Sequence, residues 1–331
     1  MTTEPSVGGQ TAIGLRLPTL GSQADGGARI RELAASAEQR GFDAVWCVDH
    51  LLASISVFGA AAWDPLMTLS FLAGATDRIA LGVSVLIVPL RHPLWLLKEL
   101  GTLSAVAGDR VLLGVGTGWD QREFDAASAD RATRGRRLDE ILAALERARQ
   151  TGTLVFDGVA VEPPPSRFLA ILSGGGSSAT VPEGGRPAVL ADRVRDRIVQ
   201  ADGWIVRSSA PPAMMKADLE TIERRRIELG RPRPLVARAT FLHVSTRADR
   251  ERALDEQHDA IRAIGYRGTR EEFERAYPCG RVDEVVAWLA EAVAGGADHL
   301  ILHPVGDVGQ QLGLIADEVL GRVGGKATAR R

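Results

Sequence analysis

Short apolar runs and amphipathic runs alternate along most of the chain. The apolar runs are rich in Val, Ile and Leu and are almost unbroken, as in strands that are buried on both faces. Each is followed by a stretch in which apolar residues recur at helical spacing. The predicted strands cover 12–17, 44–48, 79–88, 111–115, 168–172, 203–206, 235–244 and 299–302. The predicted helices cover 28–40, 64–75, 93–107, 134–149, 188–200, 216–229, 247–264, 271–276 and 282–294, with a last helix after Val308.

This alternation predicts an α/β fold, and the count of about eight strand–helix units favours a closed (β/α)8 TIM barrel over an open doubly wound sheet. No linker divides the sequence, so we expect one domain over residues 1–331, with flexible tails at about 1–10 and 324–331. We also expect insertion loops at the C-terminal face of the barrel. Active sites of such barrels lie at the C-terminal ends of the strands, which is where candidate residues are to be sought.

The composition and net charge of the chain argue against nucleic acid and membrane surfaces as ligands. The chain has 331 residues, is 45% hydrophobic and 25% charged, and carries a formal net charge of -2. This composition is typical of an ordinary globular protein and gives no indication of binding to nucleic acid or to a membrane surface. No run approaches the ~20 apolar residues of a membrane span, and the first residues lack a signal-peptide pattern. We therefore expect a cytoplasmic protein that acts on a small molecule.

The two cysteines, Cys47 and Cys279, are far apart and have neither disulfide nor zinc spacing. Cys47 lies in a predicted strand, where a small buried hydrophobe is the expected role. His299 and His303 are four apart and share one face of a strand, which makes a metal pair conceivable. No third ligand of suitable spacing accompanies them, so packing in the barrel is favoured and no metal site is predicted.

Polar residues and glycines gather where the predicted strands end. Asp49 and His50 follow the second strand, and a histidine there either exchanges a proton near neutral pH or packs on the barrel rim. Ser84 interrupts an apolar strand, either as a core serine or where backbone approaches a flat ligand. The run Gly114–Gly118 lets backbone come close to a ligand and adds the hydroxyl of Thr117. It lacks Gly-x-Gly-x-x-Gly spacing, so a dinucleotide fold is not supported and a structural turn remains the alternative.

A glycine- and serine-rich stretch after the fifth predicted strand is the best candidate for an anion site. Residues 173–178 read SGGGSS and offer backbone amides and hydroxyls. A second pair, Gly184 and Gly185, precedes the next helix and could instead place its amides at a helix N-terminus. Either segment is equally well interpreted as a surface loop.

Four segments together resemble the bacterial luciferase-like monooxygenase superfamily. They read DAVWCVDH at 43–50, WDPLMTLSFLAGATDRIALGVSVLIVPLRHP at 63–93, DRVLLGVGTGWDQREFD at 109–125 and GRRLDE at 135–140. The likeness covers the first half of the chain and resumes weakly at 201–206 and near 295–303. Within the superfamily, the pattern is more similar to the branch that depends on coenzyme F420 than to luciferase itself.

The resemblance implies a flavin-type ring at the C-terminal mouth of the barrel, with Asp49 and His50 near its reactive edge. It implies a non-prolyl cis peptide at Ser84–Val85, behind the ring. The cofactor-binding residues that it implies are Ser84, Val85, Thr117, Gly118 and Trp119, with Gly174, Gly175, Gly176 and Ser177 at the phosphate. Some deazaflavin relatives carry an acid directly after the Thr-Gly pair, whereas this chain has Trp119, which departs from that pattern.

The leading hypothesis is an oxidoreductase that uses coenzyme F420 for hydride transfer, with His50 as proton donor or acceptor. Residues 51–62 and Trp63 would form an apolar wall for a small, fairly apolar substrate. One alternative is a two-component monooxygenase that uses FMNH2 and O2, and another is a non-catalytic flavin-binding protein on the same barrel. A metal-dependent hydrolase using His299 and His303 is a further hypothesis. Expected partners are a flavin or F420 reductase and a second copy of the chain in a homodimer.

Overall fold

The computed structural model describes residues 11–19, 26–52, 62–178, 181–182, 189–245, 250–263 and 266–323. Both predicted tails lie outside these residues, as do the glycine pair Gly184–Gly185 and most of the predicted apolar wall at 51–62. No helix within the described ranges combines the length and the apolar character that a membrane span requires.

Eight parallel strands form a closed barrel. They are β1 (Ala12–Arg16), β2 (Ala44–Cys47), β3 (Ala80–Ile87), β4 (Val111–Gly116), β7 (Ala170–Gly175), β9 (Gly203–Val206), β10 (Leu235–Val244) and β13 (His299–Pro304). They pair in chain order, β13 pairs with β1, and the pairing of β9 with β10 completes the circle. The prediction of a (β/α)8 barrel is confirmed.

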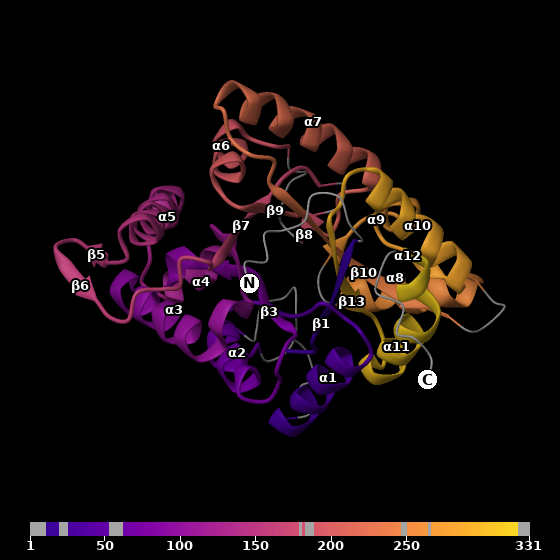
Figure 1. The fold of residues 1–331 in the computed structure, drawn as a ribbon. Helices are drawn as coiled ribbons and strands as arrows, with labels where there is room; N and C mark the ends of the chain where they lie inside the picture. Colours follow the sequence, from indigo (N-terminus) through magenta and orange to yellow (C-terminus); the bar gives the residue numbers. More distant parts are fainter. Residues whose placement is uncertain are drawn as a thin grey trace.

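Helices follow the strands and surround the barrel (Figure 1). The longer ones are α1 (Gly27–Gln39), α2 (Pro65–Ala73), α3 (Pro93–Ala107), α5 (Arg134–Thr151), α6 (Asp192–Gln200), α7 (Pro212–Glu228), α8 (Arg250–Ala263) and α10 (Val282–Ala294). Shorter helices are α4 (Gln121–Ala126), α9 (Arg270–Ala276), α11 (Val308–Leu314) and α12 (Leu320–Val323). Additional short strands are β5 (Leu154–Phe156), β6 (Val159–Val161), β8 (Val181–Pro182), β11 (Tyr266–Arg267) and β12 (Cys279–Gly280).

Two differences from the predicted elements bear on the site. The fifth barrel strand, β7, runs from Ala170 to Gly175 rather than over 168–172, so Gly174 and Gly175 belong to the strand and not to a loop after it. Their ladder partners on β9, Ile205 and Val206, keep them extended. The short helix α4 was not predicted, because six residues are too few to show helical periodicity.

Apolar side chains fill the barrel on both faces of its strands. Outward-facing residues pack against the helices, and this core includes Cys47, which is fully buried as predicted. Inside the barrel, the buried indole of Trp46 occupies the space left by glycines on the neighbouring strands. A β-carbon on Gly82 would lie 2.3 Å from Trp46 Cε3, and one on Gly14 would lie 2.3 Å from Trp46 Nε1. Glycine is therefore required at both positions while Trp46 is present.

His299 lies in the barrel interior beside Trp46. The indole Nε1 donates to His299 Nε2 at 3.3 Å, and the two rings meet edge to face. Burial lowers the pKa of His299 to about 4. The imidazole is thus a neutral hydrogen-bond acceptor, consistent with the packing role favoured for it. Among the described residues, no cluster of three or more His, Cys, Asp or Glu side chains is arranged to hold a metal.

Acid is expected to destabilise the fold through His299. An unfolded histidine titrates near 6.5, so between pH 6.5 and about 4 the unfolded chain binds a proton that the folded chain does not. The free energy of unfolding should fall with decreasing pH over this window, by about 2 kcal/mol between pH 6.5 and 5. Denaturant unfolding at several pH values, with His299→Gln as the comparison, checks this. An unchanged pH slope in the variant would contradict it.

Candidate active site

Asp49, at the end of β2, fastens the ends of two neighbouring strands together. Its side chain is 7% exposed, and its Oδ2 accepts the backbone N–H of Ile87, the last residue of β3, at 2.8 Å. Arg91 Nη2 donates to Asp49 Oδ1 at 2.9 Å and to Asp64 Oδ2 at 2.8 Å. Burial raises the pKa of the Asp49 carboxyl above its ordinary value, and Arg91 opposes that effect. Both carboxylate oxygens are engaged, a geometry that suits positioning rather than proton transfer.

His50 contacts a carboxylate that comes from α4. Glu123 Oε1 lies 3.2 Å from His50 Nδ1 and also accepts the backbone N–H of Leu51 at 2.7 Å. The glutamate is almost completely buried, with 1% of its surface exposed. A histidine–carboxylate pair at the C-terminal end of the barrel is an arrangement that supports general acid–base chemistry.

The Ser84–Val85 peptide of β3 is cis, as the resemblance implies. The ladder between β3 and β4 shifts register here, between Val83 and Leu86, and both residues of the cis peptide are half-buried. Val85 turns its side chain towards the next strands. A β-carbon on Gly116 would lie 2.6 Å from Val85 Cγ2, and one on Gly174 would lie 2.7 Å from Val85 Cγ1. Glycines at the ends of β4 and β7 thus leave the space that Val85 fills.

Thr117, Gly118 and Trp119 continue from β4 and are half-buried beside these residues. Gly118 has a φ of 70°, and a β-carbon there would lie 2.6 Å from Ile87 Cγ2. The backbone therefore turns sharply over the end of β3 at a place where only glycine fits. The turn leads into α4, which Asp120 caps by accepting the N–H of Arg122.

Two donors of the expected phosphate loop, both from Ser177, are already engaged. Ser177 N–H donates to Asp218 Oδ2 at 2.7 Å, and its hydroxyl donates to Asp218 Oδ1 at 2.8 Å. Asp218, on α7, places a buried carboxylate where an anion was expected. The exposed Arg207, just after β9, donates from Nε to the carbonyl of Gly176 and brings a positive charge to the same loop. Both donors of Ser177 are therefore occupied by Asp218, and the positive charge at this loop comes from Arg207.

The opposite side of the mouth is built by β1, β10 and β13. Arg16 Nη1 donates to His303 Nδ1 at 2.7 Å, and the His303 ring lies 4.1 Å from that of Phe241, centroid to centroid. Burial, assisted by the charge of Arg16, lowers the pKa of His303 well below its ordinary value. Phe241 is only 3% exposed, so its ring supports the wall from within, and the half-buried, neutral imidazole of His303 is the more accessible part of it.

The predicted site residues on β2, β3, β4 and β7 therefore lie together at one end of the barrel. Val85 contacts the glycine positions of β4 and β7, Asp49 contacts Ile87, and His50 contacts Glu123. Ser177 faces Asp218 instead. The sequence alone predicted no role for Arg91, Arg207 or Asp218. It also did not show that the side chain of Glu123 points towards His50. The spacing from Asp120 to Glu123 is a helix N-terminus signal that could have found α4.

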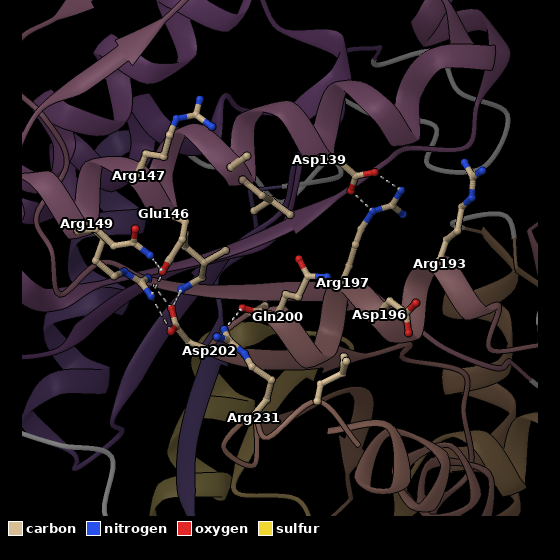
Figure 2. Close-up of a pocket in the computed structure, with 16 residues that line it drawn as sticks. Asp139, Glu146, Arg147, Arg149, Arg193, Asp196, Arg197, Gln200, Asp202 and Arg231 are labelled. Carbon is tan, nitrogen blue, oxygen red and sulfur yellow. Dashed lines mark hydrogen bonds and ion pairs between the residues drawn. The ribbon is translucent and has the colours of Figure 1, made fainter. Parts of the chain in front are cut away.

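A large groove lies elsewhere on the molecule. It has a volume of about 780 Å³ and runs between α5 and α6, near Ile171 at the start of β7 and Asp202 just before β9. These positions mark the N-terminal end of the barrel, opposite the candidate site. Figure 2 shows that arginine–aspartate pairs, Arg149–Asp202 and Arg197–Asp139, cross it. None of the predicted site residues lines this groove, so it is not the candidate active site.

A known protein family matches most of the chain. The model of the luciferase-like monooxygenase family matches residues 11–299. An F420-dependent glucose-6-phosphate dehydrogenase of Nakamurella multipartita is 28% identical over 242 residues, which cover 70% of this chain and 67% of that protein. The first curated relatives align over shorter regions, and the chain spans between 26% and 54% of their length.

Two solved structures share the fold at low sequence identity. An F420-dependent secondary alcohol dehydrogenase in complex with an F420-acetone adduct has a TM-score of 0.74 and 16% identity, over 95% of this chain and 99% of that one. The oxygenating constituent of 3,6-diketocamphane monooxygenase from Pseudomonas putida, in complex with FMN, has a TM-score of 0.70 and 15% identity, over 95% and 99%. The family match over residues 11–299 shows that this chain belongs to the luciferase-like monooxygenase family.

Proposed function

We propose that this protein is an oxidoreductase that transfers a hydride between coenzyme F420 and a small, fairly apolar organic substrate. The observation that carries the proposal is the pairing of His50 with the buried Glu123 at the C-terminal mouth, close to the cis peptide Ser84–Val85. The similarity to an F420-dependent glucose-6-phosphate dehydrogenase over most of the chain supports the choice of cofactor. When bound, the deazaflavin supplies the carbon that accepts or donates the hydride.

The chain's own residues then have separate tasks. Val85, Thr117 and Gly118 form the surface that receives a flat ring, and Arg207 offers a positive charge to a phosphate. Asp49 holds the ends of β2 and β3 in place. His50 exchanges the proton that must accompany hydride transfer to or from an oxygen-bearing carbon.

A second candidate function is a monooxygenase that uses FMNH2 and O2. The observation that favours it is Trp119, which stands directly after the Thr-Gly turn and is half-buried there. An aromatic side chain at this place helps to exclude water from the mouth, which oxygen chemistry on a reduced flavin requires. This alternative needs a flavin reductase as a partner, whereas the F420 proposal needs an F420-reducing enzyme.

Binding titrations of the purified protein with F420 and with FMN, each oxidised and reduced, test the two candidates. Micromolar affinity for F420 without affinity for FMN supports the first proposal. Affinity for FMN alone overturns it in favour of the monooxygenase. Binding of neither cofactor overturns both.

We also propose that the protein forms a homodimer through α2 and α3, which pack against each other. Met67 on α2 is 72% exposed and Trp95 on α3 is 68% exposed, and Phe71 lies one turn after Met67. Large exposed apolar side chains on two neighbouring helices are typical of an interface.

Trp95→Arg should therefore halve the mass of the particle in solution, because a charge in the centre of an apolar contact is costly to bury. Sedimentation at micromolar concentration measures this. Ile227→Arg, on an exposed apolar position of α7, is the control and should leave the mass unchanged. A wild-type protein that sediments as a monomer would contradict the proposal.

A further inference from the structure

Glu123 is a buried carboxylate with an unusual set of partners. It is 1% exposed, and its carboxylate contacts the segment after β2 at the Nδ1 of His50 and at the backbone N–H groups of Leu51 and Leu52. A carboxylate is costly to bury unless donors surround it. The three contacts join residues that are 71 to 73 positions apart in the sequence, so they connect α4 to the segment after β2, across the intervening strand β3.

The two backbone partners indicate which group donates and which accepts in the contact between His50 and Glu123. An amide N–H can only donate, so Glu123 Oε1 must accept from Leu51. The same carboxylate then accepts from His50, which places the imidazole proton on Nδ1. Nε2 is left as the nitrogen with the lone pair, because a neutral imidazole carries one proton.

We propose that Glu123 is the positioning residue that holds His50 in its Nδ1–H tautomer, so that Nε2 exchanges the proton with substrate. The proposal rests on the proposed function, since it assigns a partner to the same proton-exchanging histidine. The proposal also accounts for Trp119, the residue that stands where an acid would directly follow the Thr-Gly turn. In this chain the carboxylate is that of Glu123, four residues later, and it acts by contacting His50.

A purely structural role for Glu123 would be to hold the amides of Leu51 and Leu52. Glu123→Gln separates the two roles, because the amide keeps the size and one acceptor oxygen but loses the charge and the second acceptor. We expect a fall of at least tenfold in kcat with KM nearly unchanged. Asp125→Asn, on the exposed face of the same helix, is the matched control and should keep full activity. Equal kinetics in wild type and Glu123→Gln would overturn the proposal.

The tautomer is measured on the cofactor-free wild-type protein. Ring nitrogen chemical shifts of 15N-histidine-labelled protein identify which nitrogen carries the proton, and His50→Asn assigns the His50 signals. We expect Nδ1–H in the wild type and a shift towards Nε2–H in Glu123→Gln. An Nε2–H wild-type ring would overturn the inference even if the variant failed to fold. Because no cofactor is needed, this result is independent of the F420 and FMN titrations: an Nδ1–H ring in a protein that binds neither cofactor would leave the pairing intact and the proposed function wrong.

Discussion

His50→Ala is expected to lower turnover by about 100-fold or more, because a positioned general acid or base contributes roughly that much to the rate. The imidazole lies beside the buried Glu123 at the mouth of the barrel, and no other histidine of the described residues contacts that carboxylate. Affinity for the cofactor should change little, since the proposed function assigns the ring surface to Val85, Thr117 and Gly118 and not to His50. Steady-state kinetics with any substrate that turns over, together with a cofactor titration of the variant, measure both effects.

The control is His92→Ala. His92 is exposed at the start of α3, and its side chain makes no capping hydrogen bond there, so this variant should keep normal turnover. If His50→Ala retained turnover within a few-fold of wild type, His50 would not be the proton-exchanging group. If it lost cofactor affinity to the same extent as turnover, the histidine would be a binding residue instead.

The barrel could be predicted because its strands have a recognisable pattern in the local sequence. The run Ile79–Val88 is apolar except for Gly82 and Ser84 and is buried along most of its length, so its composition is sufficient to find the strand. The predicted helix at 282–294 has the bounds of α10, since its apolar period is regular and two glycines follow it. The position of the site followed from the fold class alone, because the C-terminal strand ends of such barrels converge.

The rest of the site depends on contacts between distant segments, which a single sequence does not encode locally. Glu123 meets His50 across 73 residues, and Ser177 meets Asp218 across 41. The glycines of SGGGSS looked like a flexible cradle, but pairing with β9 makes Gly174 and Gly175 part of a strand. In each case the deciding interaction is tertiary. The sequence shows which type of residue is present, but it does not show which distant residue that side chain contacts.

Asp49 links the candidate site to the strands and helix that support it. One of its oxygens holds the backbone at Ile87, and the other holds Arg91, which also reaches Asp64 at the start of α2. The residue before His50 thus holds the end of the strand that carries the cis peptide. Under the proposed function, the ends of β2 and β3 must stay in register, so the packing beneath them matters for activity as well as for stability.

Trp46 is the largest side chain beneath that mouth, and Trp46→Ala is expected to lower the free energy of unfolding by about 3–5 kcal/mol. The indole is fully buried among small residues that cannot refill its space, and its loss also removes the N–H that His299 accepts. Denaturant unfolding at pH 7 measures the change. Ile227→Ala, at an exposed apolar position, should change stability by no more than about 0.5 kcal/mol. An equally small effect at Trp46 would contradict the packing argument.

A double-mutant cycle with Gly82 shows whether the glycine and the indole are matched. Gly82→Ala alone should destabilise by about 1–3 kcal/mol, because the new methyl group would lie within 2.6 Å of three atoms of the Trp46 ring. In a Trp46→Leu background the same methyl group has room, so its cost should fall to near zero and the cycle should report a coupling energy of about 1 kcal/mol or more. Simple additivity of the two substitutions would mean that the barrel relaxes around the extra carbon. The glycines of β1 and β3 would then serve the backbone rather than the indole.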